Sequence, residues 1–232
     1  MILFIKHVDI EGPETLGAFF VKQGFELAVI DLHRGQKLSA NLDGIDAVVS
    51  LGGPMNVYEE AEHPFLKDED IFLKKVLRSN IPFLGICLGA QLLAKASGGK
   101  VVRSPKPEIG WFNVDLTADG LRDPLFKGLP MTMEVYQWHG DMAVIPAGGV
   151  HLASSQACPV QAFRVGRNAY GLQFHAEITD KSIDEWSQDY APEKQGERQV
   201  MQARYKVVEK DFVRYGEMLC RNFLTVMQSD KL

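Results

Sequence analysis

Apolar residues in the first part of the chain form short blocks that alternate with longer segments of helical spacing. The short apolar blocks, which predict strands, lie at 2–8, 25–31, 47–51 and 81–86. The segments of helical spacing, which predict helices, lie at 14–23, 65–79 and 88–97. Strands separated by helices in this way favour right-handed crossovers and a mainly parallel sheet covered on both faces.

The pattern changes beyond about residue 100. Short apolar segments separated by turns continue to about residue 159, and they predict antiparallel strands added to the sheet. Two segments at 160–164 and 170–175 then predict a hairpin. From 183 to 227 the pattern is helical, with a break at Ala191-Pro192. The candidate strands of the middle region are 101–102, 112–116, 131–136, 143–145 and 151–154.

Nothing in the sequence divides the chain into separate domains. Its 232 residues contain no Ser/Pro/Gly-rich linker, no low-complexity segment and no internal repeat. We therefore expect one domain over 1–232, with a core of about 1–180 and a helical C-terminal extension of about 181–232.

Composition restricts the classes of function. Hydrophobic residues make up 46% of the chain and charged residues 24%, as in a globular protein with a sizeable core. The net charge is −5 and the basic residues are scattered, which argues against nucleic acid as a partner. No apolar segment approaches the ~20 residues that span a bilayer. The three cysteines are far apart, so we expect free thiols and a cytoplasmic location.

One cysteine lies between two glycines where an apolar strand is followed by a helix. The segment reads Gly85-Ile86-Cys87-Leu88-Gly89. A sharp strand-to-helix turn of this kind exposes a nucleophile, and the glycines leave room for it. The N-terminus of the following helix favours the thiolate form of Cys87. We therefore interpret Cys87 as a candidate nucleophile.

A cysteine nucleophile needs a base, and His175 is the best candidate among the six histidines. His175 ends an apolar segment, and Glu177 follows two residues later. In an extended backbone, residues i and i+2 point the same way. Glu177 is therefore expected to lie beside the imidazole, to fix its tautomer and to stabilise the imidazolium.

An acyl-transfer site also needs backbone N–H groups that face the developing oxyanion. Leu88, directly after the nucleophile, supplies one of them in the elbow geometry. Gly52-Gly53-Pro54 follows a predicted strand and offers a second. Because ligand sites in open α/β sheets lie at the carboxyl ends of strands, we expect Gly53, Cys87 and His175 to meet there.

Four blocks of sequence together resemble the class I glutamine amidotransferases. The resemblance covers about residues 40 to 180 and is greatest to the amidotransferase domain of GMP synthase and to its stand-alone relatives, which include γ-glutamyl peptidases. The blocks are Gly52-Gly53-Pro54-Met55, Gly85-Ile86-Cys87-Leu88-Gly89-Ala90-Gln91, Trp138-His139-Gly140-Asp141 and Gly171-Leu172-Gln173-Phe174-His175-Ala176-Glu177.

The resemblance implies a fold and a reaction. The fold is an α/β, flavodoxin-like three-layer sandwich with a mainly parallel central sheet. The reaction is cleavage of a γ-glutamyl amide through a γ-glutamyl thioester, without a cofactor. The residues implied are a catalytic triad of Cys87, His175 and Glu177, an oxyanion hole at Gly53 and Leu88, and a substrate-binding set of Gln91 and a loop of Trp138, His139, Gly140 and Asp141.

Two departures from the family pattern stand out. Ala176 occupies the position between the histidine and the glutamate where the family usually has proline. The chain also shows no phosphate loop of the kind that an ATP-pyrophosphatase domain requires. No metal is expected at His139 and Asp141, because no third ligand lies at a useful spacing. Cys158 and Cys220 are expected to be thiols without a functional role.

Three hypotheses remain open. The chain is a stand-alone γ-glutamyl hydrolase, an ammonia-supplying glutaminase subunit of a separate synthetase, or a regulatory protein with little turnover on the same fold. The expected partners are a small γ-glutamyl substrate, a synthetase under the second hypothesis, and a second copy of the chain as a homodimer. The helical tail is expected either to cover the pocket or to form a dimer face.

Overall fold

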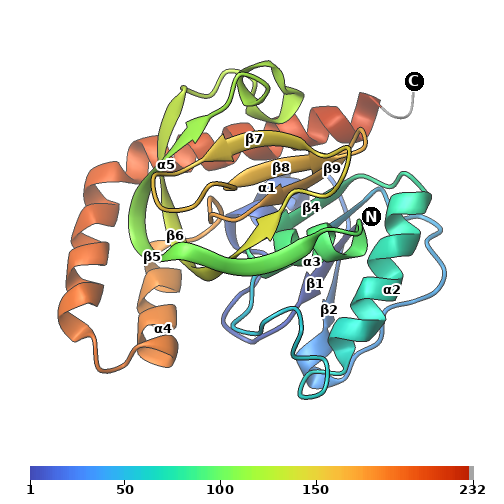
Figure 1. Ribbon diagram of the computed structural model, residues 1–232, viewed down its shortest axis with the longest axis horizontal. Coiled ribbons are helices and arrows are strands. Elements are labelled where there is room, and N and C mark those ends of the chain that lie inside the picture. The colour runs from blue at the N-terminus through green and yellow to red at the C-terminus, as the bar shows by residue number, and fades with distance from the viewer. Residues whose placement is uncertain (230–232) are drawn as a thin grey trace.

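The computed structural model describes residues 1–229, and over that range a nine-stranded mixed sheet runs through the molecule (Figure 1). One half of the sheet is parallel and has the strand order of flavodoxin-like folds. Its strands, in spatial order, are β2 (Leu27–Asp31), β1 (Ile2–Lys6), β3 (Ala47–Ser50), β4 (Phe83–Ile86) and β9 (Ala169–Leu172). The apolar pattern predicted the first four of these strands within the correct segments.

The other half of the sheet is antiparallel and continues from β9. Its strands, again in spatial order, are β8 (Ala162–Val165), β7 (Val150–Ser154), β5 (Lys100–Leu116) and β6 (Thr132–Val144). The predicted hairpin is β8–β9, and the predicted segment 151–154 is β7. The other predicted segments of the middle region belong to the long pair β5–β6.

The prediction of a loop at Trp138–Asp141 is wrong, because β6 runs straight through these residues. Trp138 is paired with Ile109, and His139 with Glu108. The pairing of β5 and β6 is irregular between Arg103 and Glu108. The residues that the resemblance placed in a loop thus lie in a strand whose backbone is paired, so their positions are fixed by the sheet.

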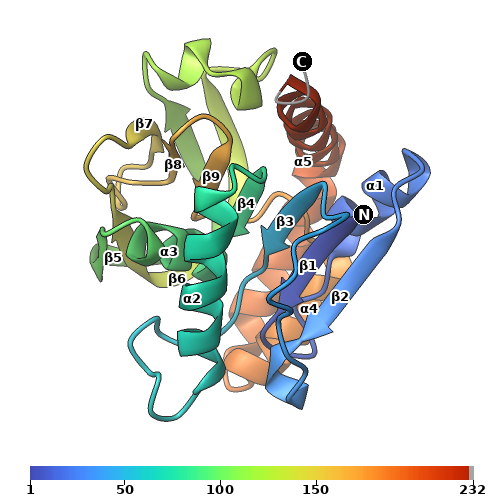
Figure 2. The ribbon, with the colours of Figure 1, turned by 90° about the vertical axis from the view of Figure 1, so that its right-hand side faces the viewer.

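Successive residues of the central strands face two different hydrophobic cores. Ile2 and Phe4 of β1 pack into one core, and Leu3 and Ile5 into the other. Helices α1 (Glu14–Lys22) and α5 (Gln195–Ser229) complete the first core, whereas α2 (Phe65–Arg78) and α3 (Leu88–Ala96) complete the second. Figure 2 shows these two pairs of helices on opposite sides of the parallel strands, which makes the expected three-layer sandwich.

The C-terminal helices are packed against the sheet. The predicted break at Ala191-Pro192 separates α4 (Asp180–Tyr190) from the long α5. Trp186 of α4 packs with Tyr136 of β6, and Phe223 of α5 packs with Phe20 of α1. Within residues 1–229, no helix combines the length and the apolar character needed to cross a bilayer. Three 3-10 helices connect the larger elements, at Leu32–Arg34, Gly120–Arg122 and Pro124–Phe126.

Candidate active site

Cys87 sits in a strained turn between β4 and α3, with φ 50° and ψ −104°. The turn is held by hydrogen bonds from its own N–H to Leu172 O (2.8 Å) and from Gln91 N–H to its carbonyl (3.1 Å). A Cβ atom on Gly89 would lie 2.1 Å from Ser50 O, and one on Gly85 would lie 2.4 Å from Gly89 O. Only glycine fits these close backbone contacts, which is why the cysteine is boxed by glycines.

His175 and Glu177 lie side by side, as the sequence predicted. His175 Nδ1 is 2.6 Å from Glu177 Oε1, and both side chains are buried. Strand β9 ends at Leu172, earlier than predicted, but backbone hydrogen bonds with Tyr136 keep His175 extended. The other carboxylate oxygen of Glu177 accepts a hydrogen bond of 2.9 Å from Ala176 N–H.

The surroundings of His175 favour its charged form. Burial lowers the pKa of the imidazole, but the Glu177 carboxylate and a hydrogen bond with Cys87 outweigh burial and raise the pKa well above its ordinary value. Cys87 Sγ also lies 3.5 Å from Gln173 Nε2, an N–H donor that stabilises a thiolate. The arrangement thus places a cysteine sulfur beside an imidazole whose charged form is favoured.

Gly53 and Leu88 line the same cavity as Cys87 and His175. Among the described residues, no hydrogen-bond acceptor is found for the backbone N–H of either. Both N–H groups are therefore available to a substrate oxygen. N–H groups without a partner in the protein are one requirement of an oxyanion hole.

Behind the Gly52-Gly53 turn lies a buried polar network that sequence reasoning missed. His7 Nδ1 contacts Gly52 O at 3.0 Å, and His7 Nε2 contacts Glu69 Oε2 at 2.7 Å. Ser50 Oγ donates to the other oxygen of Glu69 at 2.7 Å. Burial lowers the pKa of His7, but Glu69 outweighs it and raises the pKa above its ordinary value. His7 follows β1, and its position at the carboxyl end of a central strand was an available signal.

The cavity has a volume of about 620 Å³. It lies within the size range of cavities that hold small-molecule ligands. Glu177 lies behind His175 and does not line it. The other predicted site residues all do, namely Gly53, Cys87, Leu88, Gln91, Trp138, His139, Gly140, Asp141 and His175.

Gln91 is anchored within the wall of this cavity. Its Nε2 donates to Gln173 Oε1 at 3.2 Å and to Asp141 O at 3.3 Å. These bonds join α3 to β6 and to the residue that follows β9. The amide N–H groups of Gln91 are thus bound to the protein, and its carbonyl oxygen is the atom left for a ligand.

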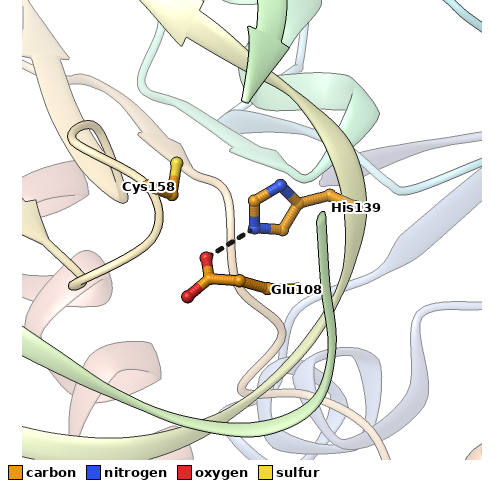
Figure 3. A group of neighbouring side chains, drawn as sticks. All are labelled: Glu108, His139 and Cys158. Atoms are coloured by element: carbon orange, nitrogen blue, oxygen red, sulfur yellow. Dashed lines mark hydrogen bonds and ion pairs between the residues drawn. The ribbon is translucent and has the colours of Figure 1, made fainter. Parts of the chain in front are cut away.

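His139 belongs to a buried cluster with Glu108 and Cys158 (Figure 3). The potential ligand atoms of the three residues lie within 4.8 Å of one another, so the spacing argument that His139 lacks further ligands does not hold in three dimensions. Glu108 is nevertheless saturated by donors: Gln161 Nε2 at 2.6 Å, Ser155 Oγ at 2.7 Å and His139 Nε2 at 3.1 Å.

The hydrogen bonds of this cluster make it a support for β6. Burial raises the pKa of the Cys158 thiol to about 11, which disfavours the thiolate that a metal would bind. His139 Nδ1 contacts Asp141 O at 3.0 Å. The network thereby fixes the segment of β6 that faces the cavity.

Cys220 is buried as well, and burial raises its pKa to about 12.

Helix α4 of the C-terminal extension forms part of the cavity wall, whereas no described residue of α5 lines the cavity. Trp186, Asp189 and Tyr190 of α4 line its wall, together with Glu11 from the segment after β1. Glu11 is buried and accepts a hydrogen bond of 2.7 Å from Tyr190 Oη. No motif pointed to these residues, because they come from segments whose sequence is typical of a solvated loop and an amphipathic helix.

Comparison with known proteins identifies similar chains. A family model described as glutamine amidotransferase class-I matches residues 14–186. The glutamine amidotransferase-like protein YfeJ of Salmonella typhimurium is 30% identical over 201 residues, which are 84% of each chain. One of the subunits of the glutamine-hydrolysing GMP synthase of Sulfolobus acidocaldarius is 38% identical over 148 residues, 62% of this chain and 74% of the relative.

The fold is also found among solved structures. A crystal structure of a glutamine amidotransferase from Thermotoga maritima superimposes with a TM-score of 0.87 at 34% identity, over 97% of this chain and 96% of that one. Several curated relatives named GMP synthase are much longer, and the match spans only 24% of their length. The similarity to those relatives therefore concerns one part of them.

Proposed function

The chain belongs to the class I glutamine amidotransferase family, and we propose that it hydrolyses γ-glutamyl amides with Cys87 as nucleophile. Membership of the family supports an enzyme that hydrolyses glutamine. The observation that carries the proposal is that Cys87 and His175 line one cavity. Glu177 lies behind the imidazole, with its Oε1 2.6 Å from His175 Nδ1.

In the first half of the reaction, the Cys87 thiolate attacks the carbonyl carbon of the γ-amide. The carbonyl oxygen becomes an oxyanion and accepts hydrogen bonds from the N–H groups of Gly53 and Leu88. The His175 imidazolium then protonates the leaving nitrogen, the C–N bond breaks, and a γ-glutamyl thioester remains on Cys87.

In the second half, His175 is neutral and takes a proton from water. The resulting hydroxide attacks the thioester carbonyl, and the same N–H groups hold the second oxyanion. Collapse breaks the C–S bond, so that glutamate leaves and the thiolate–imidazolium pair is restored. Glu177 keeps the imidazole oriented and stabilises its positive charge throughout.

The α-amino and α-carboxylate groups of the substrate have a separate part of the wall available. The carbonyl oxygen of Gln91 and the Trp138–Asp141 segment of β6 offer acceptors there, and Arg103 offers a cation. Asp141 Oδ1 is 3.4 Å from Arg103 Nε. The Asp141 carboxylate can therefore pair with the α-ammonium of a glutamyl group, and the Arg103 guanidinium with its α-carboxylate.

A second candidate function is that of a glutaminase that supplies ammonia to a separate synthetase. Relatives named as one of the subunits of GMP synthase favour it. Steady-state hydrolysis of glutamine and of a panel of γ-glutamyl conjugates, followed by mass spectrometry, separates the candidates. Turnover of conjugates by the chain alone supports a stand-alone hydrolase. Weak activity on glutamine alone that rises when a synthetase is added supports the second candidate, and no turnover by wild type contradicts both.

A further inference from the structure

The cavity wall beside His175 contains a carboxylate that the proposed mechanism does not use. Glu11 is only 6% exposed and lines the cavity. Its Oε1 accepts the Tyr190 hydroxyl at 2.7 Å, whereas Oε2 has no hydrogen bond or ion pair among residues 1–229. Because Glu11 lines the cavity and this oxygen has no donor from the protein, it is available to a donor from a ligand.

Glu11 Oε2 lies next to the proton donor of the reaction. A Cβ atom placed on Gly52 would lie 2.0 Å from Glu11 Oε2 and 3.2 Å from His175 Cε1, so both atoms flank the same point. Because His175 must protonate the departing nitrogen, the leaving group has to lie beside this imidazole. The free oxygen of Glu11 therefore faces the leaving group.

The glutamyl part of the substrate has a different set of partners. Gln91 is bonded to Gln173 and to Asp141, and Asp141 pairs with Arg103, which is the only lysine or arginine among the described residues that line the cavity. Within the described chain, no hydrogen bond joins these residues to Glu11 or Tyr190. The wall is thus divided into one part that holds Arg103 and Asp141 and another part that holds Glu11, Asp189 and His175.

The surroundings of Glu11 suit a cation. Asp189 adds a second carboxylate to the same wall. Trp138 and Tyr190 lie 6.0 Å apart between ring centroids, and Trp186 is 4.7 Å from the His175 ring. Aromatic faces attract ammonium groups and accommodate the methylene chain that carries them. An anionic leaving group would be repelled by both carboxylates.

We propose that Glu11, Asp189 and Tyr190 form a leaving-group subsite for an amine that carries a second, protonated amino group. The substrate class is then the γ-glutamyl amides of diamines and polyamines. This inference rests on the proposed γ-glutamyl hydrolase function. The distal ammonium donates to Glu11 Oε2, while the amide nitrogen stays within reach of His175.

The test compares three γ-glutamyl amides of equal length, made from diaminobutane, butylamine and aminobutyrate. Their distal groups are cationic, neutral and anionic. For the wild-type enzyme we expect kcat/KM for the cationic amide to exceed that for the neutral one by about tenfold or more, since a hydrogen bond to a charged group contributes ~1.5–3 kcal/mol. The anionic amide should be the poorest of the three.

The variant Glu11→Gln removes the charge and keeps a hydrogen-bonding group for Tyr190. We expect it to lower the ratio of kcat/KM for the cationic and neutral amides by about tenfold. Asp189→Asn, at an exposed position, should lower the same ratio by a smaller factor. The matched control is Glu185→Gln, on the same helix but paired with Lys181 outside the cavity, which should leave the ratio unchanged.

The outcomes separate this inference from the function on which it rests. If no γ-glutamyl amide is hydrolysed, the proposed function is wrong. If all are hydrolysed but the cationic one is not preferred, only the leaving-group subsite is wrong. If Glu11→Gln slows all three amides by the same factor, Glu11 acts on the glutamyl part and the subsite is again wrong. The wild-type comparison decides the matter even if the variant does not fold.

Discussion

His7 Nε2 lies 2.7 Å from Glu69 Oε2, and both side chains are fully buried behind the Gly52-Gly53 turn. The other ring nitrogen of His7 holds Gly52 O at 3.0 Å. Helix α2 therefore reaches through this pair to the backbone beside the oxyanion hole. The position of the Gly53 N–H depends on a charge pair that does not itself touch the substrate.

Breaking this pair is expected to cost stability and rate together. Glu69→Ala removes the partner of His7 Nε2 and of Ser50 Oγ, so we expect the free energy of unfolding to fall by about 3–5 kcal/mol. We also expect kcat to fall more than KM rises, since the Gly53 N–H loses its support. Denaturant unfolding and steady-state kinetics measure both effects.

The control for Glu69→Ala is Glu62→Ala at an exposed position just before α2, which should change stability by no more than ~0.5 kcal/mol. Unchanged stability in Glu69→Ala would show that the pair does not hold the turn.

The charge on Glu177 should control the alkaline limb of the pH–rate profile. Glu177 raises the pKa of His175, and the imidazolium is the form that protonates the leaving nitrogen. Activity is thus present below the raised pKa and is lost as pH rises through it. Glu177→Gln removes the negative charge, which lowers that pKa, so the alkaline limb of kcat/KM should move to lower pH. A limb that stays in place would contradict the role given to Glu177.

The alanine between His175 and Glu177 supplies a hydrogen bond that proline cannot make. Ala176 N–H donates to Glu177 Oε2 at 2.9 Å, in a buried environment. Ala176→Pro removes this donor, and we expect kcat to fall by about tenfold, the worth of a hydrogen bond to a charged group. Ala176→Gly keeps the N–H and should retain most of the rate. Equal kcat values for Ala176→Pro and Ala176→Gly would contradict this explanation of the alanine at the position where the family usually has proline.

The elbow should not accept a methyl group at Gly89. The Cβ of Gly89→Ala would lie 2.1 Å from the backbone oxygen of Ser50, which cannot move without displacing β3. We expect a loss of about 1–3 kcal/mol in unfolding free energy and a lower kcat, because α3 shifts under Cys87. Gly196→Ala, where nothing lies within 4 Å, is the matched control and should be neutral or stabilising.

The sequence predicted those parts of the fold and site that depend on local pattern. Strands β1 to β4 follow apolar blocks, and the Cys87 elbow follows from its flanking glycines. The meeting of His175 and Glu177 follows from extended geometry. Each of these features is written within a few neighbouring residues, so a pattern or a motif is enough to find it.

Of the features that join distant segments, the meeting of Gly53, Cys87 and His175 was predicted, because each follows a predicted strand, but several others were not. The resemblance implied a loop at Trp138–Asp141, between the predicted strands 131–136 and 143–145, yet pairing with β5 makes this segment part of a strand. The contact of His7 with Glu69 and that of Glu11 with Tyr190 join residues far apart in the chain. Histidine, glutamate and tyrosine are residue types that are common at protein surfaces. Only tertiary packing buries these four side chains, so the sequence contained no sign of their contacts.

The central claim, a γ-glutamyl thioester on Cys87, is tested most directly by trapping that intermediate. The enzyme is mixed with a γ-glutamyl amide, quenched in acid during turnover and digested for peptide mass spectrometry. The account predicts a γ-glutamyl adduct on the Cys87 peptide of the wild-type enzyme and no adduct in Cys87→Ala. Hydrolysis that continues in Cys87→Ala, or an adduct found on Cys158 or Cys220 instead, would contradict it.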